Sequence, residues 1–278
     1  MQVVYDPELL SELERQAAAI RRAVVAMIAG AGHGHPGGGL SAVEIVTALY
    51  FRVLRVDPSR PHWEERDRFV LSKGHGAAAW YAALAARGYF SSDEFKGFRR
   101  TGGMLQGHPD MRKVPGVDMT SGSLGQGLSA ALGMALAARY LGRSYRVYVL
   151  LGDGEMQEGQ IWEAAMAASH WRADNLTAIL DYNRVQLDGA LSEIMEVEPV
   201  AAKWDAFGWH VIDCADGHSI PQLLEAFDRA RTVVGRPAII IAHTVKGKGV
   251  SFMEGQAAWH GVSDPSRLPE ALREVCAR

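Results

Sequence analysis

The sequence predicts an α/β fold with a doubly wound, mostly parallel sheet and helices on both of its faces. Strand-like apolar runs and helix-like periodic segments alternate along the 278 residues without an intervening linker. Two of these runs, residues 144–151 and 176–180, are largely apolar, as is typical of buried parallel strands. The segment between them, residues 158–170, has a helical pattern and completes a right-handed βαβ unit. We therefore expect one domain over residues 1–278.

The other elements follow from capping signals and apolar periodicity, in chain order. Pro7 and Glu8 open a helix that we expect to run to about residue 30. Ser41, with Glu44 in the capping-box position, opens a second helix to about residue 52, after a glycine-rich break expected to be a loop. Later segments have strand, helix or loop patterns: strands at 68–71, 209–213 and 238–242, helices at 76–87, 124–141, 219–233 and from 269, and a polar loop at 247–260.

The composition excludes several classes of partner. The net charge is −3 and the pI is near 6.4, so the chain lacks the basic character that binds nucleic-acid phosphates. Cys214 and Cys276 are far apart and predict neither a zinc cluster nor a disulfide framework, which fits a reducing cytoplasm. The first residues lack an apolar signal core, and residues 23–29 are too few to span a bilayer. We expect a cytoplasmic protein that contacts neither nucleic acid nor membrane.

Polar residues follow two neighbouring predicted strands. Asp153, between Gly152 and Gly154, follows the first strand, and Asn183 follows the second. Because the carboxyl ends of parallel strands open at the same edge of a sheet, these side chains should converge. Carboxylate, amide and backbone carbonyl oxygens suit Mg²⁺ that still carries phosphate oxygens. Asp-Gly alone is a common turn signal, but the combination of strand, Gly-Asp-Gly, helix, strand and Asn is much rarer.

Five of the ten histidines fall in glycine-bearing loops. Such loops place an imidazole on a turn, where it can bind phosphates and hydroxyls or transfer protons near neutral pH. A single histidine of this kind is more often a surface or capping residue, whereas the clustering favours a site. Zinc or iron binding by His33 and His35 is disfavoured, because no carboxylate or cysteine has a supporting spacing. The five are His33, His35, His75, His108 and His260.

Two further features have a structural and a functional interpretation. Gly122, Gly125 and Gly127 mark a tight loop entering a helix, which can bind an anion or lie close to a flat ring, or can serve helix packing alone. Glu158 and Glu163, on the helix after Gly154, are compatible with a solvated surface, yet both adjoin the predicted ligand edge.

Taken together, seven short motifs resemble the transketolase family, in the order of that family and over nearly the whole chain. The resemblance implies a thiamine diphosphate-binding domain, with Mg²⁺, or Ca²⁺ or Mn²⁺ in its place, held by Asp153, Asn183 and the backbone carbonyl of Val185. It also implies an enzyme that transfers a two-carbon ketol unit between sugar phosphates in the pentose phosphate pathway. The motifs are GHPG at 34–37, LSKGH at 71–75, GHPD at 107–110, TSGSLGQG at 120–127, GDGEMQEG at 152–159, DYN at 181–183 and WHG at 259–261.

The resemblance also implies roles for the loop residues. His75 and His260 would contact the diphosphate or the reactive centre of the cofactor, and His35 and His108 would bind sugar hydroxyls and relay protons together with His260. Glu158 and Glu163 would join a carboxylate network across a subunit interface. The remaining cofactor contacts would come from Gly122, Ser123, Leu124, Gly152, Gly154 and Glu155.

One departure from the family matters most. Full-length transketolases continue into a second α/β domain, which supplies the glutamate that protonates the aminopyrimidine ring, and then into a C-terminal domain. This chain resembles the N-terminal subunit of a split transketolase, so we expect a C-terminal partner subunit and a heterotetramer of two chains of each kind. Two alternatives stay open: a split ketol transferase acting on an unusual sugar, and a non-catalytic cofactor-binding subunit. The resemblance assigns no role to His33.

Overall fold

The computed structural model describes residues 5–277, so the ends of the predicted domain, residues 1–4 and 278, lie outside the described residues. Its main sheet has five parallel strands in the order β1-β2-β3-β7-β6. The predicted α/β class and parallel sheet are confirmed. The strands are β1 (Arg68–Leu71), β2 (Val147–Gly152), β3 (Leu176–Tyr182), β6 (His210–Cys214) and β7 (Ala238–His243), and an antiparallel hairpin joins β4 (Val185–Gln186) to β5 (Gly189–Ala190).

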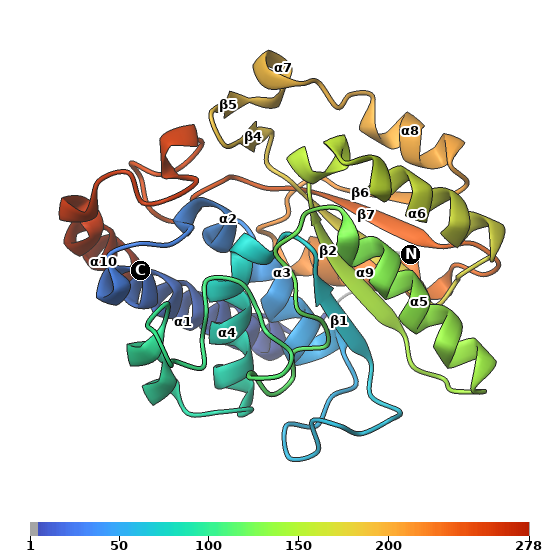
Figure 1. Cartoon of the computed structure of the whole chain (residues 1–278), viewed down its shortest axis with the longest axis horizontal. Coiled ribbons are helices and arrows are strands. Elements are labelled where there is room, and N and C mark those ends of the chain that lie inside the picture. Colours follow the sequence, from blue (N-terminus) through green and yellow to red (C-terminus); the bar gives the residue numbers. More distant parts are fainter. Residues whose placement is uncertain (1–4, 278) are drawn as a thin grey trace.

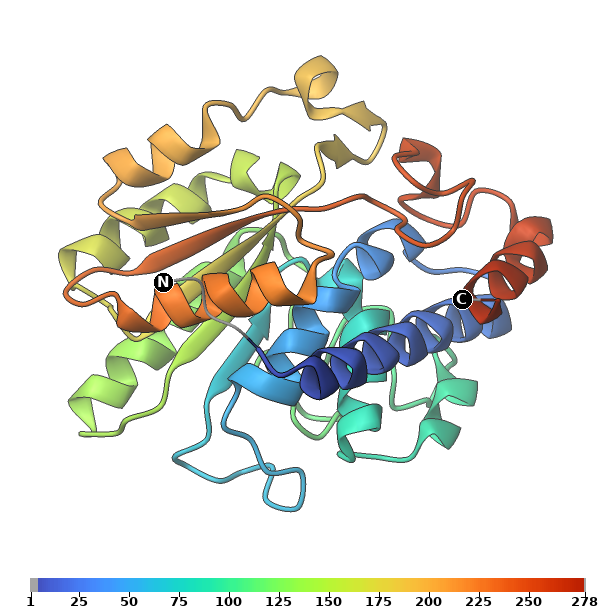
Figure 2. The same cartoon turned by 180° about the vertical axis from the view of Figure 1, so that it is seen from behind.

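Helices cover both faces of the sheet because the side chains of each strand alternate between two apolar clusters. Along β2, Val147, Val149 and Leu151 belong to one cluster, while Tyr148 and Leu150 belong to the other. Figure 1 shows α5 and α6 on the near face, and Figure 2, seen from behind, shows α9 and α1 on the opposite side. The helices are α1 (Pro7–Ala31), α2 (Pro36–Leu40), α3 (Val43–Ala48), α4 (Ala77–Arg87), α5 (Gln126–Tyr140), α6 (Gly159–His170), α7 (Leu191–Ile194), α8 (Val200–Ala206), α9 (Ile220–Thr232) and α10 (Leu268–Cys276).

The predicted helix at 41–52 is present over residues 43–53, but its capping box and the all-loop prediction for the preceding segment are wrong. The chain instead forms α2 within the expected loop, then α3, and then a π-helical turn over Leu49–Val53. Ser41 does not cap α3, because its hydroxyl donates to the carboxylate of Asp181 at 2.6 Å. Glu44 likewise does not reach back to Ser41, because it accepts hydrogen bonds from Arg21 and His218. Contacts with distant segments therefore replace the local capping pattern.

Within the described residues, no helix has both the length and the apolar character needed to cross a membrane. Cys214 is buried and Cys276 is exposed, and both are free thiols.

Candidate functional site

The loops that follow four parallel strands bring polar side chains to one edge of the sheet. Lys73 follows β1, Asp153 follows β2, Asn183 follows β3 and Lys246 follows β7. The strands end level with one another, since Gly152 is paired with Asp181, and Asp181 with Ala242. This is the edge at which parallel α/β sheets bind ligands.

A cavity of about 200 Å³ opens at this edge. Its wall contains most of the residues that the sequence singled out, and it adds two lysines. The lining residues are Gly38, Lys73, His75, Leu124, Gly152, Asp153, Gly154, Glu155, Gln157, Glu158, Asn183, Val185, Gln186, Leu187, Lys246 and His260.

A buried ion pair forms the floor of the site. The ammonium of Lys73 contacts the carboxylate of Asp181, and the two side chains are 2% and 0% exposed. Burial alone would raise the pKa of Asp181, but Lys73 and hydrogen bonds from Ser41 and Thr244 hold it below its ordinary value. The carboxylate is therefore ionised and fully engaged, which ties the ends of β1, β3 and β7 to the loop before α3.

Asp153 is buried next to this pair and forms no ion pair with any of residues 5–277. Its carboxylate accepts hydrogen bonds from the backbone N–H of Gly154, at 2.8 Å, and of Arg184. Burial, and then the nearby charge of Asp181, raise the pKa of Asp153 to about 6. A buried carboxylate with a raised pKa gains from a metal ion, so the oxygen-rich surroundings fit Mg²⁺ chemically.

The other expected metal ligands lie beside Asp153. The side-chain oxygen of Asn183 accepts from the backbone N–H of Val185 at 3.2 Å. The backbone carbonyl of Val185 accepts from Lys246 Nζ at 2.7 Å. Burial, and then the charge of Lys73, lower the pKa of Lys246 to about 8. Two lysines beside a cavity suit an anionic ligand such as a diphosphate.

Four of the five loop histidines form a cluster. The ring centroid of His35 is 5.8 Å from that of His75, 6.0 Å from that of His108 and 5.5 Å from that of His260. The rings of His75 and His260 are 5.0 Å apart. Gly38 permits this arrangement, because a Cβ at this position would lie 2.7 Å from the imidazole of His75.

The surroundings keep all four imidazoles neutral at physiological pH. Burial, and then nearby positive charge, lower the pKa of His35 to about 4 and that of His260 to about 3. Burial is also the main cause of the lowered pKa values of His75 and His108. Each neutral ring has one donor and one acceptor nitrogen, as proton transfer requires. Nδ1 of His260 is buried without a hydrogen-bond partner among the described residues.

The remaining predicted residues differ in their distance from the cavity. Leu124 lines it, Gly122 lies against the ring of His108, and Ser123 is exposed. Glu155 is buried and accepts from the backbone N–H groups of Gly125, at 2.8 Å, and Gly152, at 3.0 Å, and from the hydroxyl of Ser72. Its carboxylate therefore holds three loops together.

Glu158 and Glu163 both lie on the solvent side of the site. Glu158 is exposed at the cavity wall, and Glu163 is exposed on α6 outside the wall. His33 stands apart from the four-histidine cluster, where its Nδ1 accepts from Nε of Arg99 at 2.7 Å. Among residues 5–277, no group of three or more His, Cys, Asp or Glu side chains is arranged to hold a metal.

The sequence interpretation missed Lys246 and the partners of Asp181. The signal that found Asp153, a polar residue just beyond a predicted strand, also applies to Lys73 and Lys246. Ser41 and Thr244 carried no comparable signal, because their role depends on contact with Asp181 across the fold.

The fold and the site define a parallel α/β protein with a cavity at the carboxyl edge of its sheet that is lined by two lysines and by oxygen-bearing side chains. The family pattern described as "Transketolase, thiamine diphosphate binding domain" matches residues 13–267. The chain therefore belongs to the transketolase family through its thiamine diphosphate-binding domain, which confirms the resemblance predicted from the motifs.

Similar proteins include both separate subunits and longer chains. A 6-deoxy-6-sulfo-D-fructose transketolase subunit of Clostridium sp. is 50% identical, with 90% of this chain and 91% of that protein covered. An apulose-4-phosphate transketolase subunit of Phocaeicola vulgatus is 43% identical, with 96% and 94% covered. The structure of transketolase from Leishmania mexicana has a TM-score of 0.91 at 33% identity, covering 95% of this chain and 41% of that one. The prediction that this chain is a transketolase subunit is thus confirmed.

Proposed function

We propose that this chain binds thiamine diphosphate and a divalent cation and, together with a second subunit, transfers a two-carbon ketol unit from an unusual ketose. The observation that carries the catalytic part is the cluster of four neutral imidazoles beside the cavity of Asp153 and Lys246. The choice of an unusual ketose rests on the two subunits of similar length, whose names specify 6-deoxy-6-sulfo-D-fructose and apulose-4-phosphate. These relatives favour this alternative over an ordinary role in the pentose phosphate pathway.

In the proposed arrangement, Asp153, Asn183 and the backbone carbonyl of Val185 hold Mg²⁺, with Ca²⁺ or Mn²⁺ as substitutes. Lys246 then leaves the Val185 carbonyl and pairs with the diphosphate, as its position at the cavity wall allows. His75 also contacts the cofactor. When bound, thiamine diphosphate supplies the carbon nucleophile that accepts the ketol unit.

The other contacts belong to the rings and the diphosphate of the cofactor. Gly122, Ser123 and Leu124 lie along the rings, and the loop of Gly152, Gly154 and Glu155 faces the diphosphate. His75, Glu155 and Lys246 line the same cavity as Asp153.

The neutral histidines bind the sugar and transfer its protons. His35 and His108 donate to or accept from its hydroxyls, while His260, with its buried free Nδ1, takes and returns a proton. Because all four imidazoles are uncharged, each has an acceptor nitrogen for a proton, and the lowered pKa values of His35 and His260 favour return of that proton to the sugar. Proton movement in both directions is required when one sugar is cleaved and another is formed.

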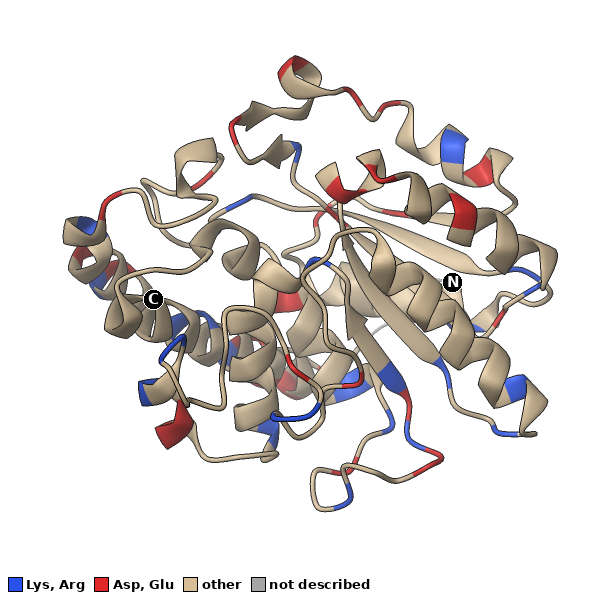
Figure 3. Ribbon diagram, in the orientation of Figure 1, with Lys and Arg blue, Asp and Glu red and all other residues tan. Residues whose placement is uncertain are grey.

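The second subunit completes the site. The cavity of about 200 Å³ is below the roughly 300–1,000 Å³ of complete small-molecule sites. The helices α5 and α6 begin beside the cavity and carry few charges (Figure 3), and large apolar side chains are exposed toward their C-terminal ends. Exposed apolar area of this kind marks a protein interface. The exposed residues are Tyr140 and Leu141 at and just after the end of α5, Met166 within α6 and Trp171 just after α6.

Across this interface we propose that Glu158 and Glu163 join a carboxylate network with the partner, in a heterotetramer of two chains of each kind. The partner would also supply the glutamate that activates the cofactor. A cytoplasmic location fits the two free thiols.

Reconstitution with the partner chain tests the proposal. Ketol transfer to a common aldose acceptor should be faster from 6-deoxy-6-sulfo-D-fructose or apulose-4-phosphate than from an ordinary pentose phosphate. The 278-residue chain alone should be inactive. Cofactor binding without transfer from any donor would support the non-catalytic alternative. Equal rates with ordinary donors would contradict the proposed preference for an unusual ketose. Light scattering of the complex tests the stoichiometry.

A further inference from the structure

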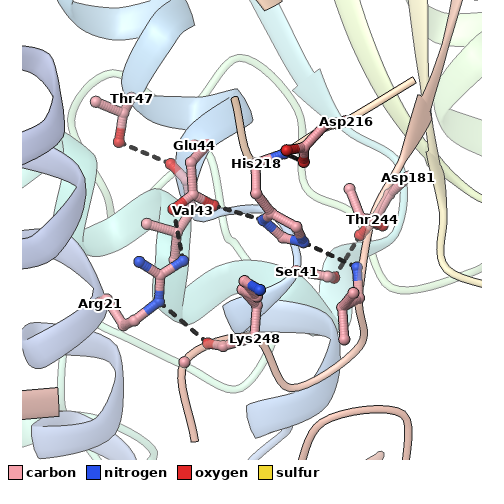
Figure 4. Close-up of polar contacts among 12 residues, drawn as sticks. Arg21, Ser41, Val43, Glu44, Thr47, Asp181, Asp216, His218, Thr244 and Lys248 are labelled. Atoms are coloured by element: carbon pink, nitrogen blue, oxygen red, sulfur yellow. Dashed lines mark hydrogen bonds and ion pairs between the residues drawn. The ribbon is translucent and has the colours of Figure 1, made fainter. Parts of the chain in front are cut away.

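A buried polar cluster joins four segments that are distant in the sequence (Figure 4). The carboxylate of Glu44 in α3 accepts from Arg21 of α1 at 2.6 Å and from Nδ1 of His218 at 2.8 Å. His218 lies in the loop after β6, and its side chain is 9% exposed while that of Glu44 is 8% exposed. This loop lines none of the cavity wall, so the cluster lies outside the site described above.

The hydrogen bonds of His218 fix the position of its ring proton. Nε2 lies 2.8 Å from the backbone nitrogen of Val245, and a backbone N–H can only donate, so Nε2 is the acceptor. The proton must then be on Nδ1, directed at the carboxylate of Glu44. Although burial raises the pKa of Glu44, His218 and Arg21 hold it below its ordinary value, so the carboxylate is ionised and accepts this proton's hydrogen bond.

The backbone that His218 binds lies between two residues of the site. The Thr244 hydroxyl donates to Asp181, and Lys246 Nζ reaches the carbonyl of Val185 at the cavity. The flanking backbone is held by Thr244 N–H to Tyr182 O, at 3.1 Å, and by Gly247 N–H to Gly37 O, at 3.0 Å. His218 therefore provides the hydrogen bond at the centre of this segment, immediately before Lys246.

We propose that His218 is a positioning residue for Lys246. By accepting the Val245 N–H, its imidazole fixes the backbone from which Lys246 extends, and Glu44 and Arg21 fix the imidazole in turn. The consequence is a fixed backbone origin for the Lys246 side chain, whose ammonium then passes from the Val185 carbonyl to the ligand by side-chain rotation alone. This inference rests on the proposed function for the identity of the ligand.

Two conservative variants separate positioning from general stability. In His218→Gln the carboxamide reaches the position of Nε2, so its oxygen can still accept from Val245. In His218→Asn the carboxamide lies near Nδ1, so it can donate to Glu44 but cannot reach Val245. A role confined to packing would affect both variants alike.

Calorimetric titration of the reconstituted complex with Mg²⁺ and thiamine diphosphate, and with Mg²⁺ and inorganic pyrophosphate, measures the effect. We expect His218→Asn to weaken binding of both probes by roughly 10- to 100-fold, as outer-shell changes commonly do, and His218→Gln to retain most of the affinity. In a Lys246→Met background, His218→Asn should cause no further loss, because the positioned group is gone.

The outcomes distinguish this inference from the proposed function. If the wild-type complex binds neither thiamine diphosphate nor pyrophosphate, the proposed function is contradicted. Wild-type binding with an equally tight His218→Asn variant, or an equal loss in both His218 variants, overturns the positioning role. Nitrogen-15 NMR of histidine-labelled wild-type chain gives a readout independent of mutation and activity: a proton on Nε2 of His218 would contradict the assignment even if a variant failed to fold.

Discussion

Replacing Asp153 by asparagine removes the charge of this side chain and nearly preserves its shape. The difference between the ordinary pKa of 3.8 and the raised value of about 6 corresponds, at about 1.4 kcal/mol per tenfold change, to about 3 kcal/mol. This is the free energy by which the cation-free fold opposes ionisation of Asp153. The variant loses one acceptor oxygen for the N–H of Gly154 or Arg184, at a cost of about 1–3 kcal/mol.

The sign of the pH dependence follows from linkage. Because the folded chain holds the extra proton between about pH 4 and 6, the unfolding free energy of the wild type falls as pH rises through this window. Asp153→Asn lacks this loss. Relative to the wild type, the variant should therefore gain about 3 kcal/mol between pH 4 and 7, ending near or above wild-type stability.

Urea denaturation of the cofactor-free chain from pH 4 to 8 measures this gain, with Asp205→Asn, at an exposed carboxylate on α8, as the matched control. Calorimetry should show that Asp153→Asn weakens Mg²⁺-dependent binding of thiamine diphosphate by at least roughly 100-fold, because the loss of a charged direct ligand should cost no less than the largest outer-shell changes. If Asp153→Asn binds the cofactor with wild-type affinity, the assignment of Asp153 as a metal ligand is wrong. A stability difference that does not change with pH would refute the electrostatic reasoning.

Two other predictions concern the histidine loops and α5. His108→Ala and His260→Ala should each lower turnover of the complex by roughly 10²- to 10⁴-fold, whereas the exposed His170→Ala should be nearly silent; equal losses would contradict the loop assignment. Gly127→Ala should unfold readily, because its Cβ would lie 2.4 Å from Cβ of Ser72, while Gly133→Ala should stabilise the lone chain by about 1 kcal/mol in urea denaturation. Poorer partner binding by Gly133→Ala alone would indicate that α5 packs against the second subunit.

The strands and long helices were predictable because they carry regular periodic signals. The strand at 68–71 coincides with β1, and the predicted strands at 176–180 and 238–242 match β3 and β7 to within two residues. Their parallel pairing also explains why Asp153 and Asn183 lie at one cavity. The main features of the site thus followed from strand ends and loop composition.

The parts that sequence reasoning missed depend on contacts between distant segments. The capping pattern at Ser41 and Glu44 is satisfied elsewhere, by Asp181 and by His218 and Arg21. The short hairpin after Asn183 and the helices α7 and α8 have too few residues for a periodic signal. His218 lies in an Asp-Gly-His turn that looks ordinary until the fold brings it to Val245.

Strand β7, the last in the sequence, lies between β3 and β6 in the sheet. The ribosome releases β6 before β7, so β6 has no strand beside it until residues 238–243 have been synthesised. The same late segment leads into Thr244 and Lys246, which complete the polar surroundings of Asp181 and the cavity. A nascent chain therefore presents an unpaired edge of β3 to chaperones until β7 emerges. It becomes able to retain a ligand only when its last strand has inserted.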